Sequence, residues 1–108
     1  MNISDDRIEQ ALKKMAATDT THAACKGEVE RLHLVKKTIE AAAYLDAPKG
    51  TIAEKEAYVY TTPEYKAHCD EYKQAVLEYQ RLTNERERER LIIEVWRTVN
   101  ANQRRGNI

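Results

Sequence analysis

Residues that interrupt helices are almost missing from this chain of 108 residues. Glycine occurs three times, proline twice and phenylalanine never, whereas Ala, Glu, Lys, Arg and Leu dominate. These residues lose little side-chain freedom in a helix, and a third of the chain is charged, which favours long helices with exposed charged faces. We therefore predict an all-α protein, and the length predicts a single helical domain over residues 1–108.

Capping residues place the first two helices. Ser4, with Asp5 and Asp6 in the first turn, predicts a short N-terminal helix over about residues 4–17. The cluster Thr18-Asp19-Thr20-Thr21 then either breaks the chain or restarts the helix. A second helix is expected over residues 21–46, because Ala47-Pro48-Lys49-Gly50 cannot continue it.

Two further helices complete the predicted fold. Thr51 and Glu54 form a capping box that begins a helix over residues 52–60. Thr62 caps a long last helix over residues 63–101, with Pro63 at a position where its missing N–H costs nothing. Residues 102–108 are expected to fray. The second helix and the first half of the last one would form an antiparallel helical hairpin.

The last helix has an unusual distribution of apolar residues. In its first half the apolar and aromatic residues share one side at about 100° per residue: Tyr65, Cys69, Tyr72, Val76, Tyr79 and Leu82. Downstream the apolar residues centre on the opposite side: Leu91, Ile92, Val95 and Val99. Residues 83–90 between them contain no apolar residue. We therefore expect a kink near residue 85 or two halves that pack against different surfaces.

The second half of this helix would then need another apolar surface. The N-terminal helix offers one, from the same chain or from a second copy: Ile8, Leu12 and Met15. Because a single small domain has little core to spare, we favour a dimeric bundle, in which a homodimer supplies part of this surface.

Two sets of side chains are candidates for recognition. The partner-binding set is aromatic: Trp96, Tyr58, Tyr65, Tyr72 and Tyr79. The set for anions or nucleic acid consists of arginines: Arg86, Arg90, Arg97, Arg104 and Arg105. Arginine suits phosphate, and neighbouring aromatic rings would serve as platforms for bases. Alternatively, Glu–Arg alternation marks a solvated helix face, and the tyrosines and Trp96 pack in the core.

Catalytic and metal-binding constellations are not predicted. His22 lies one turn from Cys25, and His68 adjoins Cys69, but hairpin pairing would separate these two pairs by several turns, so zinc would lack four converging ligands. We therefore expect no enzyme activity, metal or cofactor. Eighteen acids balance eighteen bases, so no overall field attracts nucleic acid. Two cysteines and the lack of an apolar segment of membrane-spanning length favour a cytoplasmic protein with reduced thiols and no membrane partner.

Two stretches carry a resemblance to a known group. They are Lys55-Glu56-Ala57-Tyr58-Val59-Tyr60 followed by Thr62-Pro63-Glu64-Tyr65, and Glu94-Val95-Trp96-Arg97-Thr98-Val99-Asn100-Ala101-Asn102. Over residues 28–108 the chain resembles small helical proteins of tailed bacteriophages and prophages, encoded in early regions near single-strand annealing recombinases. The resemblance implies a host bacterial cytoplasm and a role in recombination or in blocking a host defence such as a CRISPR effector. It assigns no role to any residue.

These observations lead to two functional hypotheses. In the first, the protein binds a host or phage protein stoichiometrically, through Trp96 and the tyrosine and arginine sets, and inhibits a nucleic-acid-handling defence system. In the second, it binds DNA directly as an accessory protein in phage recombination. DNA binding would weaken steeply with salt, whereas protein binding would depend on Trp96.

Overall fold

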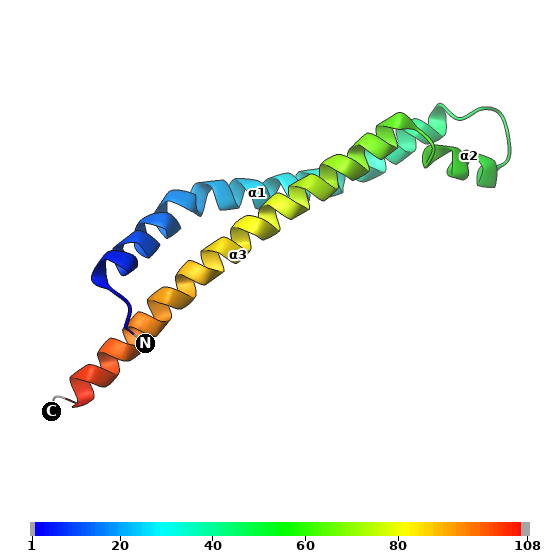
Figure 1. The fold of residues 1–108 in the computed structure, drawn as a ribbon. Helices are drawn as coiled ribbons and strands as arrows, with labels where there is room; N and C mark the ends of the chain where they lie inside the picture. The colour runs from blue at the N-terminus through cyan, green and yellow to red at the C-terminus, as the bar shows by residue number, and fades with distance from the viewer. Residues whose placement is uncertain (1, 107–108) are drawn as a thin grey trace. The chain divides into compact units, whose positions relative to one another are not determined.

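Three α-helices make up most of the computed structural model, which describes residues 2–106 (Figure 1). α1 comprises Asp5–Leu45, α2 comprises Ile52–Val59 and α3 comprises Pro63–Gly106. The described residues contain no β-strand, so the predicted all-α class is confirmed, together with the short middle helix and the long C-terminal helix. α3 continues past the predicted end at residue 101 to Gly106, and residues 107–108 of the predicted frayed tail lie outside the described residues.

The predicted caps begin all three helices. The Ser4 hydroxyl accepts a hydrogen bond from the Arg7 N–H at 3.1 Å, and the Thr51 hydroxyl accepts one from the Glu54 N–H at 3.2 Å. The Thr62 hydroxyl accepts one from the Tyr65 N–H at 3.3 Å, and Pro63 is the first residue of α3. Each cap satisfies an N–H that has no partner within its own helix.

The predicted break at Thr18–Thr21 is wrong, because α1 passes through it without interruption. The predicted helices over residues 4–17 and 21–46 are therefore one helix. The Thr18 hydroxyl donates back to the Lys14 carbonyl at 2.7 Å instead of capping a new helix. It also accepts a hydrogen bond from Arg86 of α3 at 2.7 Å. A threonine that bonds to the preceding turn can remain inside a helix, and this contact with α3 favours that arrangement.

The described residues fall into two compact units, each of which is described by itself. Unit 1 comprises residues 2–23 and 80–106, and unit 2 comprises residues 24–79. In unit 2 the backbone carbonyl of Leu32 contacts His68, and Arg31 lies 3.7 Å from Glu71. In unit 1 Arg7 contacts Glu89 and Lys14 contacts Glu85. Because positions that rise along α1 meet positions that fall along α3, the two helices are antiparallel in each unit.

Many of the buried and half-buried positions of α3 follow a spacing of three and four residues, and Thr83, Glu85, Ile92 and Val99 are half-buried outside this series. The series is Tyr65, His68, Tyr72, Ala75, Tyr79, Leu82, Arg86, Glu89, Ile93, Trp96 and Asn100. α1 shows a similar series: Ile8, Ala11, Met15, Thr18, His22, Cys25, Val29, Leu32, Val35, Ile39 and Ala43. Within each unit, this spacing is that of helices that turn one side toward a neighbouring helix.

Each half of α3 contacts a different stretch of α1 within its own unit: the first half contacts Leu32 in unit 2, and the second half contacts Lys14 in unit 1. The apolar residues predicted on the opposite side of the second half are not on the side that contacts α1, since Leu91 is 48% exposed and Val95 is 37% exposed. α3 passes through residue 85 as one uninterrupted helix. The polar residues Arg86 and Glu89 lie on the side that contacts α1.

Candidate functional site

Three neighbouring cavities lie along α1 in unit 2. Their volumes are about 370, 320 and 600 Å³. The first two share His33 and Tyr72, and a ring contact of 5.1 Å between Tyr60 and Tyr65 connects the second to the third. On α1 the cavities follow the helix from Val29 to Leu45, about 24 Å at 1.5 Å per residue. We call this surface the aromatic groove.

Aromatic rings line the middle of the groove. His68 stacks on Tyr72 with ring centroids 6.4 Å apart, and His33 lies 6.5 Å from the same tyrosine. The Nε2 atom of His68 lies 2.7 Å from the Leu32 carbonyl oxygen. Because a carbonyl can only accept, Nε2 carries a proton in this contact, which fixes the orientation of the ring. The histidine thus anchors this wall of the groove to the backbone of α1.

Tyr65 remains a neutral phenol within the groove. A hydrogen bond with Cys69 raises the pKa of the Tyr65 hydroxyl, and burial and the negative charge of Glu40 act in the same direction. Cys69 is a free, exposed thiol. The groove therefore combines the Tyr65 hydroxyl with histidine, cysteine and further tyrosine side chains, which suits an apolar ligand with a few polar groups.

The rim of the groove exposes large apolar side chains. Leu34 is 75% exposed and Leu45 is 83% exposed, and each lines one end of the groove. The exposed ring of Tyr60 lies at the Leu45 end. The charged side chains of the lining carry both signs: Glu30, Lys36, Lys37, Glu40 and Glu56. Apolar side chains that gather beside a concave surface are typical of interaction sites.

The structure brings together only some of the aromatic residues predicted from the sequence. Tyr65 and Tyr72 line the groove. Tyr58 lines a separate cavity of about 350 Å³ in unit 2, and Tyr79 is half-buried in the α3 series. Trp96 is half-buried in unit 1. Four further residues line the groove but were not predicted from the sequence: His33, Leu34, Tyr44 and Leu45. In this part of the chain the helical pattern predicts core positions only.

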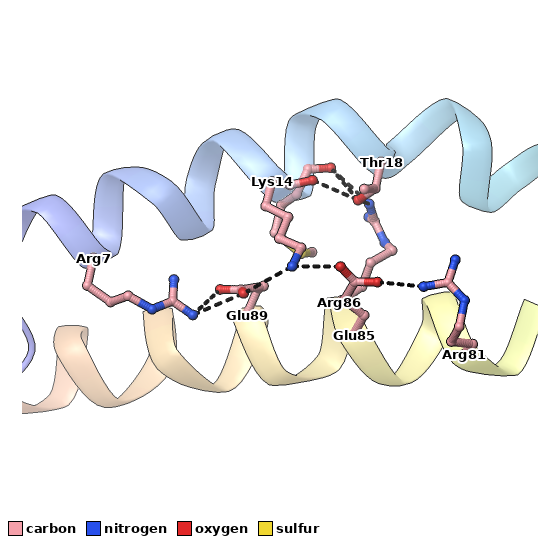
Figure 2. Close-up of polar contacts among 8 residues, drawn as sticks. Arg7, Lys14, Thr18, Arg81, Glu85, Arg86 and Glu89 are labelled. Carbon is pink, nitrogen blue, oxygen red and sulfur yellow. Dashed lines mark hydrogen bonds and ion pairs between the residues drawn. The ribbon is translucent and has the colours of Figure 1, made fainter.

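A second cluster of polar residues joins α1 and α3 in unit 1 (Figure 2). Its centre is Arg86, whose side chain is only 15% exposed. The guanidinium donates to the Met15 carbonyl at 2.8 Å, to the Thr18 hydroxyl at 2.7 Å and to the Asp19 carboxylate at 3.3 Å. Arg86 was predicted to bind anions, but it directs these donors to its own α1.

Carboxylates of α3 and cations of α1 continue this cluster, as Figure 2 shows. Lys14 lies 2.6 Å from Glu85 and 3.8 Å from Glu89. Arg7 donates to one oxygen of Glu89 at 3.0 Å and lies 2.8 Å from the other, which is buried and accepts no hydrogen bond. The hydrogen bond from Lys14 lowers the pKa of Glu85, with support from the charges of Lys14 and Arg81. We call the seven residues labelled in Figure 2 the polar layer: Arg7, Lys14, Thr18, Arg81, Glu85, Arg86 and Glu89.

The remaining predicted arginines are exposed. Arg90 forms a two-pronged contact with Glu87, at 2.9 and 2.6 Å, and Arg97 lies 3.8 Å from Glu94. Arg104 and Arg105 are in the last turn of α3, where positive charge favours the helix dipole. An anion-binding role for these four residues stays a prediction.

Comparisons with known proteins add no relative. No protein-family model matches the chain, and no curated protein or solved structure is significantly similar to it. Among residues 2–106, no three His, Cys, Asp or Glu side chains gather in a way that could hold a metal ion. None of the helices within residues 2–106 combines the length and the apolar character that crossing a bilayer requires.

Proposed function

We propose that this protein acts without catalysis, by binding another protein stoichiometrically in the aromatic groove of unit 2. The observation that carries this proposal is the exposure of Leu34 and Leu45 at the two ends of a groove lined with aromatic rings. Leaving two leucines in water is unfavourable by about 25 cal/mol for each Å² of apolar surface, and a bound partner removes this cost. Tyrosine is also common among the residues that dominate binding energies.

The groove suits an apolar segment of a partner, and above all an α-helix. Its two smaller cavities are lined by α1 and α3 and its largest by α1 and α2, so a helix placed in it would lie beside α1. The partner's apolar residues would meet the tyrosine and histidine rings, while its polar residues would meet the mixed charges of the rim. We expect the tyrosines to supply most of the binding energy and the charges to supply specificity.

The resemblance to phage proteins points to a bacterial target. We propose that the partner is a host or phage protein in the bacterial cytoplasm, and that inhibition of a nucleic-acid-handling defence enzyme is one outcome of binding. A stoichiometric inhibitor needs only affinity and shape, both of which a preformed groove supplies.

The test uses the exposed leucines, because their replacement should leave the fold intact. A tagged protein would be used to capture partners from a bacterial lysate, in parallel with a Leu34→Asp/Leu45→Asp variant. The matched control is Leu12→Asp, a change at an exposed leucine of unit 1. We expect a partner that the wild type and the control capture and the double variant loses, while circular dichroism stays unchanged. A partner retained by the double variant would exclude the groove as its site.

Direct binding of nucleic acid is the second candidate function. It is favoured by the positive charge at the end of α3 in unit 1. The helix continues to Gly106, no acid follows Glu94, and Arg104 and Arg105 are exposed in the last turn. A mobility-shift titration at low salt should then detect DNA binding that weakens steeply as salt is added. Replacing Arg104 and Arg105 by alanine should weaken binding to all sequences alike. No shift at micromolar protein would exclude this function.

A further inference from the structure

The C-terminal part of α3 carries an apolar stripe on a side that it does not turn toward α1. Leu91 is 48% exposed and Val95 is 37% exposed, while Ile92 and Val99 beside them are half-buried. At about 100° per residue these four share one side of the helix. A polar residue lies about one turn beyond each end of the stripe: Arg88 and Asn102.

The register within unit 1 leaves this part of α3 without a helical neighbour. Arg7 pairs with Glu89 and Lys14 with Glu85, so the first residue of α1, Asp5, lies opposite a position only a few residues beyond Glu89. α3 nevertheless continues to Gly106. A helix end of this length is marginal in water on its own, and most helices gain their stability from packing an apolar face.

We propose that the stripe binds the same stripe of a second copy of the chain, with the two α3 helices antiparallel and centred on Val95. Residues equally far from Val95 then face one another across a two-fold axis. Leu91 of one copy meets Val99 of the other, and the two Val95 side chains meet each other. The interface is small, so the association should depend on protein concentration.

Charge selects this orientation and this occupant. In the antiparallel arrangement Arg88 faces the neutral Asn102, and Glu87 comes within two residues of Arg105 of the second copy, on the same edge of the stripe. A parallel arrangement would place Arg88 against Arg88 on the centre line of the stripe, which is unfavourable. A polyanion would contact Arg104 and Arg105 but would leave Leu91 and Val95 in water. A second copy covers the apolar stripe and brings two Glu87–Arg105 pairs together, which outweighs the approach of Glu94 to Glu94 of the other copy.

Light scattering over a range of concentrations tests the association. We expect the mass to rise from one chain toward twice that value between about 1 and 300 μM, the range in which small interfaces associate. Val95→Asp should remain at the mass of one chain with unchanged helicity. Leu12→Asp, at an exposed leucine of α1 in the same unit, should still associate. A wild-type mass of one chain at the highest concentration would overturn the proposal, as would a dimer that survives Val95→Asp.

A cross-linking experiment tests the orientation in a Cys25→Ala/Cys69→Ser background. A short bis-maleimide should join two copies of Val95→Cys. It should not join two copies of Arg88→Cys, which the antiparallel arrangement places 14 residues, or about 21 Å, apart along the axis. A mixture of Arg88→Cys and Asn102→Cys should cross-link. Cross-linking of Arg88→Cys with itself would indicate a parallel pair and refute the proposed geometry.

Discussion

At the scale of single residues, Arg86 shows how a charge on the buried side of a helix is accommodated. Its guanidinium meets a backbone carbonyl, a hydroxyl and a carboxylate of α1, so most of its donor capacity is satisfied. A half-buried cation without such partners would be strongly destabilising, whereas one that is fully hydrogen-bonded fixes which residues of two helices lie opposite each other. We infer that Arg86 sets the register between α1 and α3 in unit 1.

The first prediction concerns this arginine. Arg86→Ala should lower the free energy of unfolding by about 1.5–3 kcal/mol, the range for hydrogen bonds that involve a charged group. Arg90→Ala removes an exposed pair with Glu87 and should change it by less than about 1 kcal/mol. Urea unfolding followed by circular dichroism measures both values. Equal effects of the two changes would contradict a register role for Arg86.

The second prediction concerns acid. Because the pKa of Glu85 is lowered in the folded protein, its interaction with Lys14 stabilises the fold at pH above the unfolded pKa. This contribution is lost as pH falls through the lowered folded pKa, below about pH 4.5. Glu85→Gln should therefore be less stable than the wild type at neutral pH, and the difference should shrink and vanish as the pH falls below the lowered pKa of Glu85. A difference that persists at low pH would show that Glu85 acts through something other than its charge.

At the scale of helices, the sequence predicts well wherever a signal is local. The Ser4, Thr51 and Thr62 caps and the start of α3 at Pro63 are each read from a few adjacent residues, and each is confirmed. Local signals misled at Thr18–Thr21, since whether a threonine caps a helix or bonds back depends on Arg86, far away in the sequence. The contact between Arg86 and Thr18 favours the continuous helix, and this contact cannot be read from neighbouring residues in the sequence.

The candidate site could be predicted only in part, for a related reason. Tyr65 and Tyr72 were identified because aromatic residues on one helix face are conspicuous. The α1 wall of the groove was not identified, because Leu34 and Leu45 resemble ordinary helix residues in the sequence. Only the structure shows that both side chains are exposed. The buried polar layer was not predicted, because charged residues such as Arg86 and Glu89 are ordinarily expected on the exposed side of a helix.

The third prediction tests the continuity of α1. Thr20→Pro should destabilise the protein by about 3 kcal/mol, because proline inside a helix removes a hydrogen bond and clashes with the preceding turn. If a new helix began near this residue, proline would instead fit its first turn at little cost. Thr20→Ala is the control and should be neutral or slightly stabilising. Chemical denaturation of the two variants distinguishes a single helix from two.

At the scale of the whole molecule, the apolar core is thin. The buried apolar side chains of the described residues are few, and two of them are alanines: Ile8, Ala11, Leu32, Ala43, Val59 and Leu82. Each unit holds three of them. Helices with so little buried apolar surface depend on polar contacts and on further partners for stability. This is consistent with the proposed occupants of the aromatic groove and of the Leu91–Val99 stripe.

The fourth prediction follows from this division of the core. Leu32 is the largest fully buried side chain and belongs to unit 2, so Leu32→Ala should cost about 2–5 kcal/mol. Leu34→Ala, at an exposed neighbour, should change stability by less than about 0.5 kcal/mol. Because local stability follows the contacts that each part of a protein makes, hydrogen exchange in Leu32→Ala should accelerate chiefly within residues 24–79. Equal acceleration at residues 8–15 and 86–96 would instead show that one cooperative transition unfolds the whole chain.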